Sequence, residues 1–345
     1  ICSAFAELGA RQKDYDSAYL AAQVVRDLIG DPGENEKEIL GKLAPYAKQK
    51  EVAQRGLTDP LWHLHLFHPK VRGPLGDLMG VLYEHAGYLY SLPLAQYQLN
   101  PKKHRIDVST AQEYQIHHYR YVARLLGMEA IDLYSPFLAA TRERLAKRAK
   151  DPVPDPQVGV EICHTHPICL RVGGKFFSEH GQKEVYYWLG RTLALARPEL
   201  ALSQRLAPER LAAVLQAAIS LSTDQFPFTV NPKLIETERE ALTKALNEPA
   251  RVALDRAVRQ YLEVATSRDL ADFIEGAELT AVRTGLFVAG EPEPAKKMVL
   301  GESGSAYRLS APSKIREMMI FALSEDLHAL RIAVGTQLEV QTRRA

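Results

Sequence analysis

Two histidines, His164 and His166, lie two positions apart in a segment, residues 158–172, that alternates apolar and other residues. On a strand this spacing places both imidazoles on one face, where they could bind a transition-metal ion. Catalytic zinc needs three protein ligands and structural zinc needs four. Two further potential ligands, Cys163 and Cys169, fall on the opposite face. The segment therefore leaves two interpretations, a metal site completed from elsewhere in the chain and an ordinary pair of histidines at a sheet edge or turn.

Three more histidines, His63, His65 and His68, fall within six residues. A metal site is one interpretation, because imidazole is the commonest metal ligand in proteins. The surrounding sequence, WHLHLFHP at residues 62–69, contains no acidic residue or cysteine that could complete such a site. The preferred interpretation is that these histidines are half-buried structural residues.

A helix within residues 175–200 is expected to be the central element of the chain. Its apolar residues recur at the i, i+3, i+4 and i+7 spacing of an amphipathic helix that packs on a core. The stripe consists of Val185, Trp188, Leu189, Thr192, Leu193 and Ala196. Gly181 and Glu184 are spaced like an N-cap and its partner three residues later, which predicts where the helix begins.

Residues 189–195, LGRTLAL, resemble the zinc-binding helix of the gluzincin metallopeptidases, the family of the CAAX-processing and heat-shock membrane peptidases. In that family the same positions are roughly Leu-(Gly/Ala)-His-Glu-Leu-(Ala/Gly)-His. Arg191 stands at the first histidine ligand, Thr192 at the catalytic glutamate and Leu195 at the second histidine ligand. The resemblance implies a degenerate zincin-like fold that lacks the zinc-binding motif.

A second segment, ELTAVR at residues 278–283, resembles a later gluzincin helix with the pattern Glu-x-x-Ala-Asp-Arg. The glutamate of that pattern is the third metal ligand of the family, and Glu278 matches it. Ala281 and Arg283 also match, whereas Val282 replaces the aspartate. Of the residues that hold and use the metal in the family, this chain retains one carboxylate.

The replaced residues cannot carry the family's chemistry. A guanidinium is permanently cationic, threonine is not a general base near neutral pH, and leucine has no lone pair. Glu278 shares a helix face with apolar residues and needs a partner, because a buried, unpaired carboxylate costs several kcal/mol. We therefore predict an ion pair between Arg191 and Glu278 in place of the metal, with Arg283 and Arg197 as rival partners.

The composition is that of a globular protein. The 345 residues include 43 lysines and arginines and 42 acidic residues, and the net charge of +1 gives no reason to expect nucleic acid or an anionic membrane as a partner. No apolar run reaches the roughly 18–20 residues that span a bilayer. The three cysteines, Cys2, Cys163 and Cys169, are too few for a disulfide framework, which favours a reducing cytoplasm.

The expected fold is mainly α with a small β element, an α+β chain in which a helical N-terminal region precedes a zincin-like, predominantly helical domain. Three prolines within residues 151–157 favour an extended linker. They divide the chain into a helical region at 1–150 and a degenerate peptidase-like domain at 158–345. Pro167 is expected to split the strand pattern of residues 158–172 into two strands.

Helices are also expected at the N-terminal end. Residues 1–30 resemble the helical hairpin of a tetratricopeptide repeat, and an ordinary helical hairpin is the alternative. The chain opens at Ile1 within a helical pattern, which suggests that further residues precede it. A long helix is predicted from Asp107 to Gly127, where the glycine would end it. The chain as a whole resembles C-terminal regions of bacterial tetratricopeptide-repeat proteins.

These features predict a non-catalytic scaffold or protein-interaction module, a cytoplasmic pseudoenzyme without a cofactor whose partners are proteins. The alternative is a metal-dependent hydrolase with His164 and His166 as relocated ligands. A third possibility is a purely helical scaffold of unrelated ancestry. It predicts no strand at residues 158–172 and no contact between the helices of Arg191 and Glu278.

Overall fold

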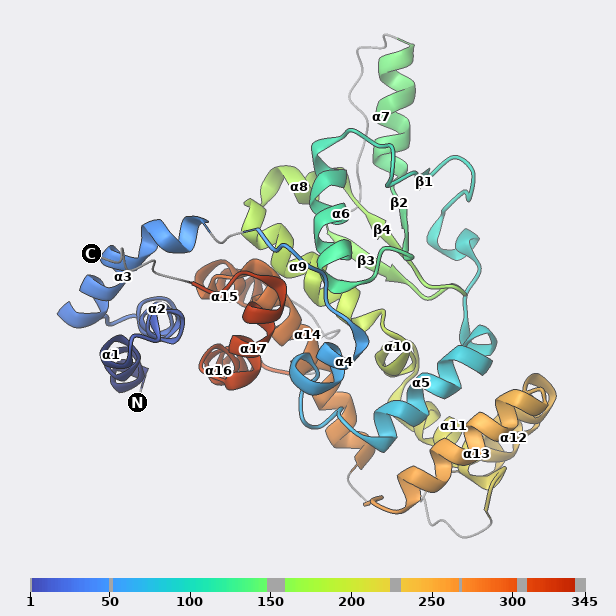
Figure 1. The fold of residues 1–345 in the computed structure, drawn as a ribbon. Coiled ribbons are helices and arrows are strands. Elements are labelled where there is room, and N and C mark those ends of the chain that lie inside the picture. Colours follow the sequence, from blue (N-terminus) through green and yellow to red (C-terminus); the bar gives the residue numbers. More distant parts are fainter. Residues whose placement is uncertain are drawn as a thin grey trace.

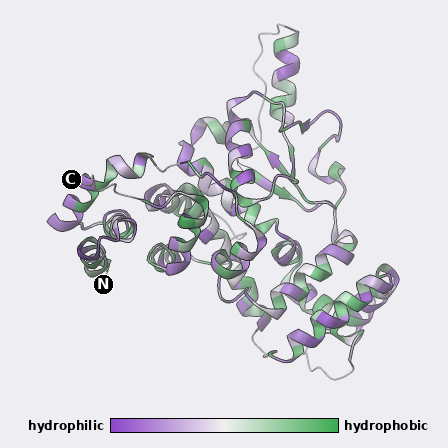
Figure 2. Cartoon of the chain, in the orientation of Figure 1, coloured by the Kyte–Doolittle hydropathy of each residue, from purple (hydrophilic) through white to green (hydrophobic). Residues whose placement is uncertain are grey.

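The computed structural model describes residues 2–49, 52–147, 159–223, 231–266, 269–302 and 309–338. Most of these residues form helices, and a small mixed sheet lies beside them (Figure 1). Hydrophobic and hydrophilic residues alternate along most of the helices (Figure 2), as expected where one face packs on a core. The predicted mainly α class with a small β element is confirmed, and the purely helical alternative is wrong.

The N-terminal helices lie together on one side of the molecule (Figure 1). They are α1 (Cys2–Gln12), α2 (Tyr15–Val24), the π-helical turn η1 (Val25–Ile29) and α3 (Glu34–Gln49). The side chain of Asp14 caps α2 by accepting a hydrogen bond from the Ser17 amide at 3.1 Å. Gly9 allows α1 to approach α2 closely, because a Cβ at this position would lie 3.0 Å from the amide nitrogen of Ala18.

The next part of the chain combines helices with short turns. Its elements are α4 (Asp59–Leu61), η2 (Trp62–Leu66), α5 (Pro74–Ala86), η3 (Gly87–Tyr90), η4 (Leu94–Tyr97), α6 (Tyr114–Leu126) and α7 (Pro136–Ala146). Helix α6 begins at Tyr114, so the predicted start at Asp107 is wrong. The Asp107 carboxylate instead accepts hydrogen bonds from the Ser109 amide and the Thr110 hydroxyl, and this local turn competes with helix. The predicted end is confirmed, since Gly127 caps α6 with φ +68°.

The sheet has the strand order β1-β2-β4-β3. Its strands are β1 (Arg105–Ile106), β2 (Asp132–Tyr134), β3 (Val160–Cys163) and β4 (Cys169–Val172). The pair β2/β4 is parallel, and the pairs β1/β2 and β3/β4 are antiparallel. The predicted split at Pro167 is confirmed. Cys163 and Cys169 face each other across β3 and β4, and both are free thiols.

The remaining helices carry most of the core. They are α8 (Gly174–Glu179), α9 (Gln182–Leu195), α10 (Pro198–Arg205), α11 (Pro208–Ser220), α12 (Pro232–Ala245), α13 (Glu248–Leu262), α14 (Asp269–Ala289), α15 (Pro292–Gly301), α16 (Ala311–Ala322) and α17 (Glu325–Val334). Several begin with proline, whose missing N–H costs nothing in a first turn. No helix among the described residues is both long and apolar enough to cross a bilayer.

The predicted linker, residues 151–157, lies outside the described residues. The sheet takes two strands from each side of it, with β2 of the first part paired to β4 of the second. One large hydrophobic cluster extends from Leu20 to Val334 and includes residues of both parts. The segments before and after the linker therefore share a hydrophobic core.

Candidate functional site

Helices α9 and α14 pack against each other at the centre of the molecule (Figure 1). Two glycines permit their close approach. A Cβ at Gly190 of α9 would lie 2.9 Å from a methyl carbon of Val288, and a Cβ at Gly285 of α14 would lie 2.6 Å from the ring of Tyr187. A larger side chain at either position would push the two helices apart.

This packing brings Arg191 and Glu278 together. The Arg191 Nη2 atom donates a hydrogen bond to Glu278 Oε1 across the two helices. Both side chains are buried, with 7% and 6% of their surface exposed. An ion pair out of water needs further polar partners to offset its desolvation.

Two more charged side chains supply those partners. Lys314 Nζ, from α16, lies 2.8 Å from Glu278 Oε1 and also contacts Glu302, which follows α15. Arg191 Nε lies 3.0 Å from Glu302 Oε1. We call Arg191, Glu278, Glu302 and Lys314 the buried quartet. Its two cations and two carboxylates balance, and they join α9, α14, α16 and the end of α15.

The buried quartet fixes the ionisation state of Glu278. Burial alone would raise the pKa of this carboxyl, because the anion loses its water. The charges of Arg191 and Lys314 outweigh burial and lower the pKa of Glu278 below its ordinary value. The group is therefore a carboxylate at neutral pH, and protein cations surround it.

The other two positions of the gluzincin resemblance, Thr192 and Leu195, hold no ionisable group. The Thr192 hydroxyl donates a hydrogen bond to the carbonyl oxygen of Trp188 at 2.8 Å. Leu195 lies in the hydrophobic core and is 5% exposed. Neither side chain offers a general base or one of the ligands that hold zinc in proteins.

The rival partners of Glu278 bind other carboxylates. Arg283 Nε donates to Glu317 Oε1 at 2.5 Å, which forms another link between α14 and α16. Arg197 donates to both carboxylate oxygens of Glu199, at 3.1 and 2.8 Å. Among the three arginines considered from the sequence, the structure thus places Arg191 against Glu278.

His164 and His166 lie in the turn between β3 and β4, because β3 ends at Cys163. The predicted arrangement on one strand face is therefore wrong. Burial, followed by the charge of Arg205, lowers the pKa of His164 to about 4. His166 is exposed, and its ring centroid lies 5.9 Å from that of Tyr83. In the described part of the chain, no three or more histidine, cysteine, aspartate or glutamate side chains are placed to hold a metal ion.

The histidines of residues 62–69 each approach a different carboxylate from a distant part of the chain. The contacts are His63 Nε2 to Glu199 Oε1 at 3.3 Å, His65 Nδ1 to Asp326 Oδ1 at 3.0 Å, and His68 Nε2 to Glu317 Oε2 at 3.7 Å. Their side chains range from 39% to 12% exposed. These contacts agree with structural histidines that tie one segment to α10, α16 and α17.

We expect His68 to make the protein less stable as the pH falls. Burial, followed by the charges of Arg283 and Lys70, lowers the pKa of His68 to about 3. An unfolded histidine titrates near 6.5, so the unfolded chain takes up this proton first. The free energy of unfolding should fall from about pH 6.5 towards pH 3, and His68→Gln should remove that part of the slope.

Urea unfolding of both proteins across this pH range measures the difference. Above about pH 7 His68 is neutral in the folded and the unfolded chain, so the two profiles should be parallel there. Parallel profiles below pH 6 as well would contradict the prediction.

Comparison with protein-family models, curated proteins and solved structures returns no match. The resemblances to gluzincins and to tetratricopeptide repeats therefore stay hypotheses. The contacts of the buried quartet stand independently of them.

Two members of the buried quartet, Glu302 and Lys314, are not among the residues predicted from the sequence. Glu302 follows a helix end and gives no local signal. Lys314 lies in the first turn of α16, where a lysine usually faces solvent. Its spacing does carry a signal, since Met318 and Phe321 follow at i+4 and i+7 and both are fully buried. A lysine on the apolar stripe of a helix indicates a buried cation that needs carboxylates.

Proposed function

We propose that the protein is a non-catalytic interaction module, a pseudoenzyme in which buried ion pairs replace the metal of a gluzincin-like helix pair. The observation that carries this proposal is the neutralisation of Glu278 by Arg191 and Lys314. In the resemblance Glu278 corresponds to a metal ligand and Arg191 to another. A carboxylate already held by two cations has little attraction left for a divalent ion.

The remaining residues of the helix pair support the same conclusion. Gluzincin chemistry needs two neutral imidazoles one turn apart and a carboxylate that activates the bound water. Thr192 and Leu195 provide neither. The buried quartet does provide a rigid connection among four elements, which suits a scaffold. No specific observation favours the alternative hydrolase that would use His164 and His166.

The interaction role rests on the N-terminal hairpin. Helices α1 and α2 pack closely around Ala6, Ala18 and Ala21, which are fully buried. Small residues at such a contact are a feature of tetratricopeptide repeats, whose arrays bind other proteins. In α1, the apolar side chains Phe5 and Leu8 are 48% and 50% exposed. We propose that these side chains contact a partner protein.

Restoring the metal ligands tests the proposed origin of the helix pair. The variant Arg191→His/Thr192→Glu/Leu195→His, combined with Lys314→Met to remove the second cation, should bind one zinc ion per chain with Glu278. Its melting temperature should then rise with zinc and fall with a chelator, whereas the wild-type protein should respond to neither. Metal analysis and thermal unfolding measure both.

The controls separate the two parts of the proposal. Adding His164→Ala/His166→Ala should not change zinc binding by the restored variant.

Partner binding is the second control. The restored variant should still capture the partner protein of the wild type, whereas Phe5→Ser/Leu8→Ser should lose it without a change in melting temperature. A folded restored variant that binds no zinc would contradict the gluzincin origin. A wild-type protein that holds a metal until His164 and His166 are replaced would favour the hydrolase.

A further inference from the structure

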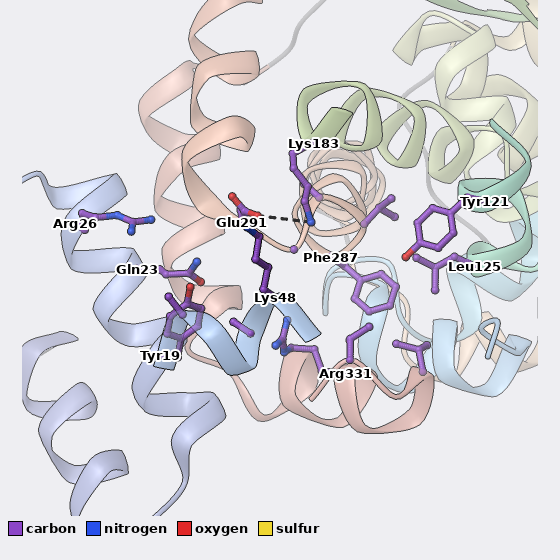
Figure 3. Close-up of a pocket in the computed structure, with 17 residues that line it drawn as sticks. Tyr19, Gln23, Arg26, Lys48, Tyr121, Leu125, Lys183, Phe287, Glu291 and Arg331 are labelled. Atoms are coloured by element: carbon purple, nitrogen blue, oxygen red, sulfur yellow. Dashed lines mark ion pairs between the residues drawn. The ribbon is translucent and has the colours of Figure 1, made fainter. Parts of the chain in front are cut away.

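A cavity of about 350 Å³ lies between the N-terminal helices and the core (Figure 3). Residues of α2 and α3 form one side of it, and residues of α6, α14 and α17 form the other. None of the residues of the buried quartet lines it. The volume falls in the range of pockets that bind small molecules.

One end of the cavity is positively charged. The cations that line it are Arg26, Lys48, Lys183 and Arg331. Three of them have carboxylate partners, in Asp27, Glu291 and Asp16 respectively. Lys48 is exposed and has no ion-pair partner among the described residues, and in Figure 3 its side chain extends towards Glu291. The cavity is therefore left with about one positive charge that a ligand can balance.

A buried amide group faces the same end. Gln23 is 3% exposed and lines the cavity, yet its Oε1 atom has no hydrogen-bond partner in the described part of the chain. In Figure 3 its amide lies beside the Tyr19 side chain, on the side of the cavity formed by the N-terminal helices. A buried acceptor without a donor destabilises the protein, and a ligand that donates to it would remove this cost.

The other end of the cavity is apolar. Phe287, Leu125 and the ring of Tyr121 lie together there (Figure 3). Phe287 and Leu125 are 7% and 4% exposed, so these side chains are already fixed by the core. Apolar and aromatic surfaces of this kind hold the body of a ligand, and a few polar groups orient it.

We propose that this cavity binds a small amphipathic organic acid. The carboxylate of the ligand meets Lys48, a hydroxyl or N–H group beside the carboxylate donates to Gln23 Oε1, and an apolar body lies between Phe287 and Tyr121. This ligand supplies the negative charge and the hydrogen-bond donor that the cavity lacks, and its apolar body matches the apolar end of the cavity. The site is separate from the proposed interaction role and does not depend on it.

Three related probes test each part of this proposal by isothermal titration calorimetry. The first, 3-phenyllactate, has the carboxylate, the hydroxyl and the apolar ring. The second, 3-phenylpropionate, lacks the hydroxyl and should bind about 3–10-fold more weakly. The third, 3-phenyllactamide, lacks the charge and should bind about tenfold more weakly or worse.

Replacing Gln23 distinguishes ligand recognition from a structural role. Gln23→Met keeps the size of the side chain and removes the unpaired acceptor, so the melting temperature of the free protein should rise. The same variant should bind 3-phenyllactate and 3-phenylpropionate equally. A purely structural glutamine would lower the melting temperature when replaced and leave the preference between probes unchanged.

The role of Lys48 is tested with Lys42, on the same helix, as the matched control. Lys48→Gln should bind 3-phenyllactate and its amide equally, whereas Lys42→Gln, whose side chain pairs with Glu38 and does not line the cavity, should keep the wild-type preference. No binding of 3-phenyllactate at millimolar concentration to folded wild-type protein would overturn the proposal. Equal binding of all three probes to the wild type would overturn it as well.

Discussion

Replacing Arg191 with methionine is expected to lower the free energy of unfolding by about 3–5 kcal/mol. The change leaves Glu278 and Glu302 in the core with Lys314 as their remaining cation in the buried quartet. Two carboxylates that share one ammonium group keep an uncompensated negative charge where water cannot solvate it. Methionine fills similar space, so the loss of charge dominates the effect. Urea denaturation followed by circular dichroism measures it.

An exposed arginine provides the control. Arg259 is 71% exposed and pairs with Asp255 one turn away on α13, so Arg259→Met should change the free energy of unfolding by at most about 0.5 kcal/mol. The double variant Arg191→Met/Glu302→Gln restores one cation facing one carboxylate and should recover part of the loss. If Arg191→Met is as mild as Arg259→Met, the buried quartet does not hold these helices together.

The contact between Arg191 and Glu278 could be expected from the sequence, because the pattern around Glu278 already shows that this carboxylate needs a cation. Glu278 lies on the apolar face of its helix, and a carboxylate in that position requires a cation. The helix period also identifies which face of each segment turns inward. The resemblance then indicates which two segments meet. Two short sequence patterns, one around Arg191 and one around Glu278, thereby predict a contact between residues that are 87 positions apart.

The contacts of Lys314 and Glu302 in the buried quartet could not be predicted from the sequence in the same way. Lys314 and Glu302 reach it through the packing of α15 and α16, and nothing near either residue specifies that packing. The predicted placement of His164 and His166 on one strand face is wrong for a related reason, although the alternative of a pair in a turn agrees with the structure. A period of two indicates a strand but not where the strand ends, and β3 ends one residue before His164. The end depends on pairing with β4.

The cavity between the N-terminal helices and the core is even harder to predict from the sequence, because it depends entirely on tertiary packing. Gln23 and Lys48 come from the N-terminal helices α2 and α3, whereas Phe287 and Arg331 come from α14 and α17, more than 200 residues later in the chain. Each has an ordinary place in its own helix, and only tertiary packing makes their side chains neighbours. A buried glutamine oxygen without a hydrogen-bond donor has no signature in the sequence, because exposure and hydrogen bonding are properties of the fold.

The second large effect is expected at Gly285, where alanine should lower the free energy of unfolding by about 1–3 kcal/mol. The added Cβ would lie 2.6 Å from the ring of Tyr187 and 2.9 Å from its carbonyl oxygen. The ring is fully buried and the carbonyl belongs to α9, so neither can move without separating α9 from α14. Such a shift would also lengthen the contacts of the buried quartet.

A glycine-to-alanine substitution in α3 should instead raise the free energy of unfolding. Gly41 is exposed within this helix, and a Cβ there meets no atom within 4 Å. Gly41→Ala should therefore stabilise the protein by about 0.5–1 kcal/mol through helix propensity alone. Chemical denaturation of the two variants compares identical changes in composition, and only the space around the new methyl group differs. If Gly285→Ala also stabilises the protein, α9 and α14 are not packed as closely as their glycines require.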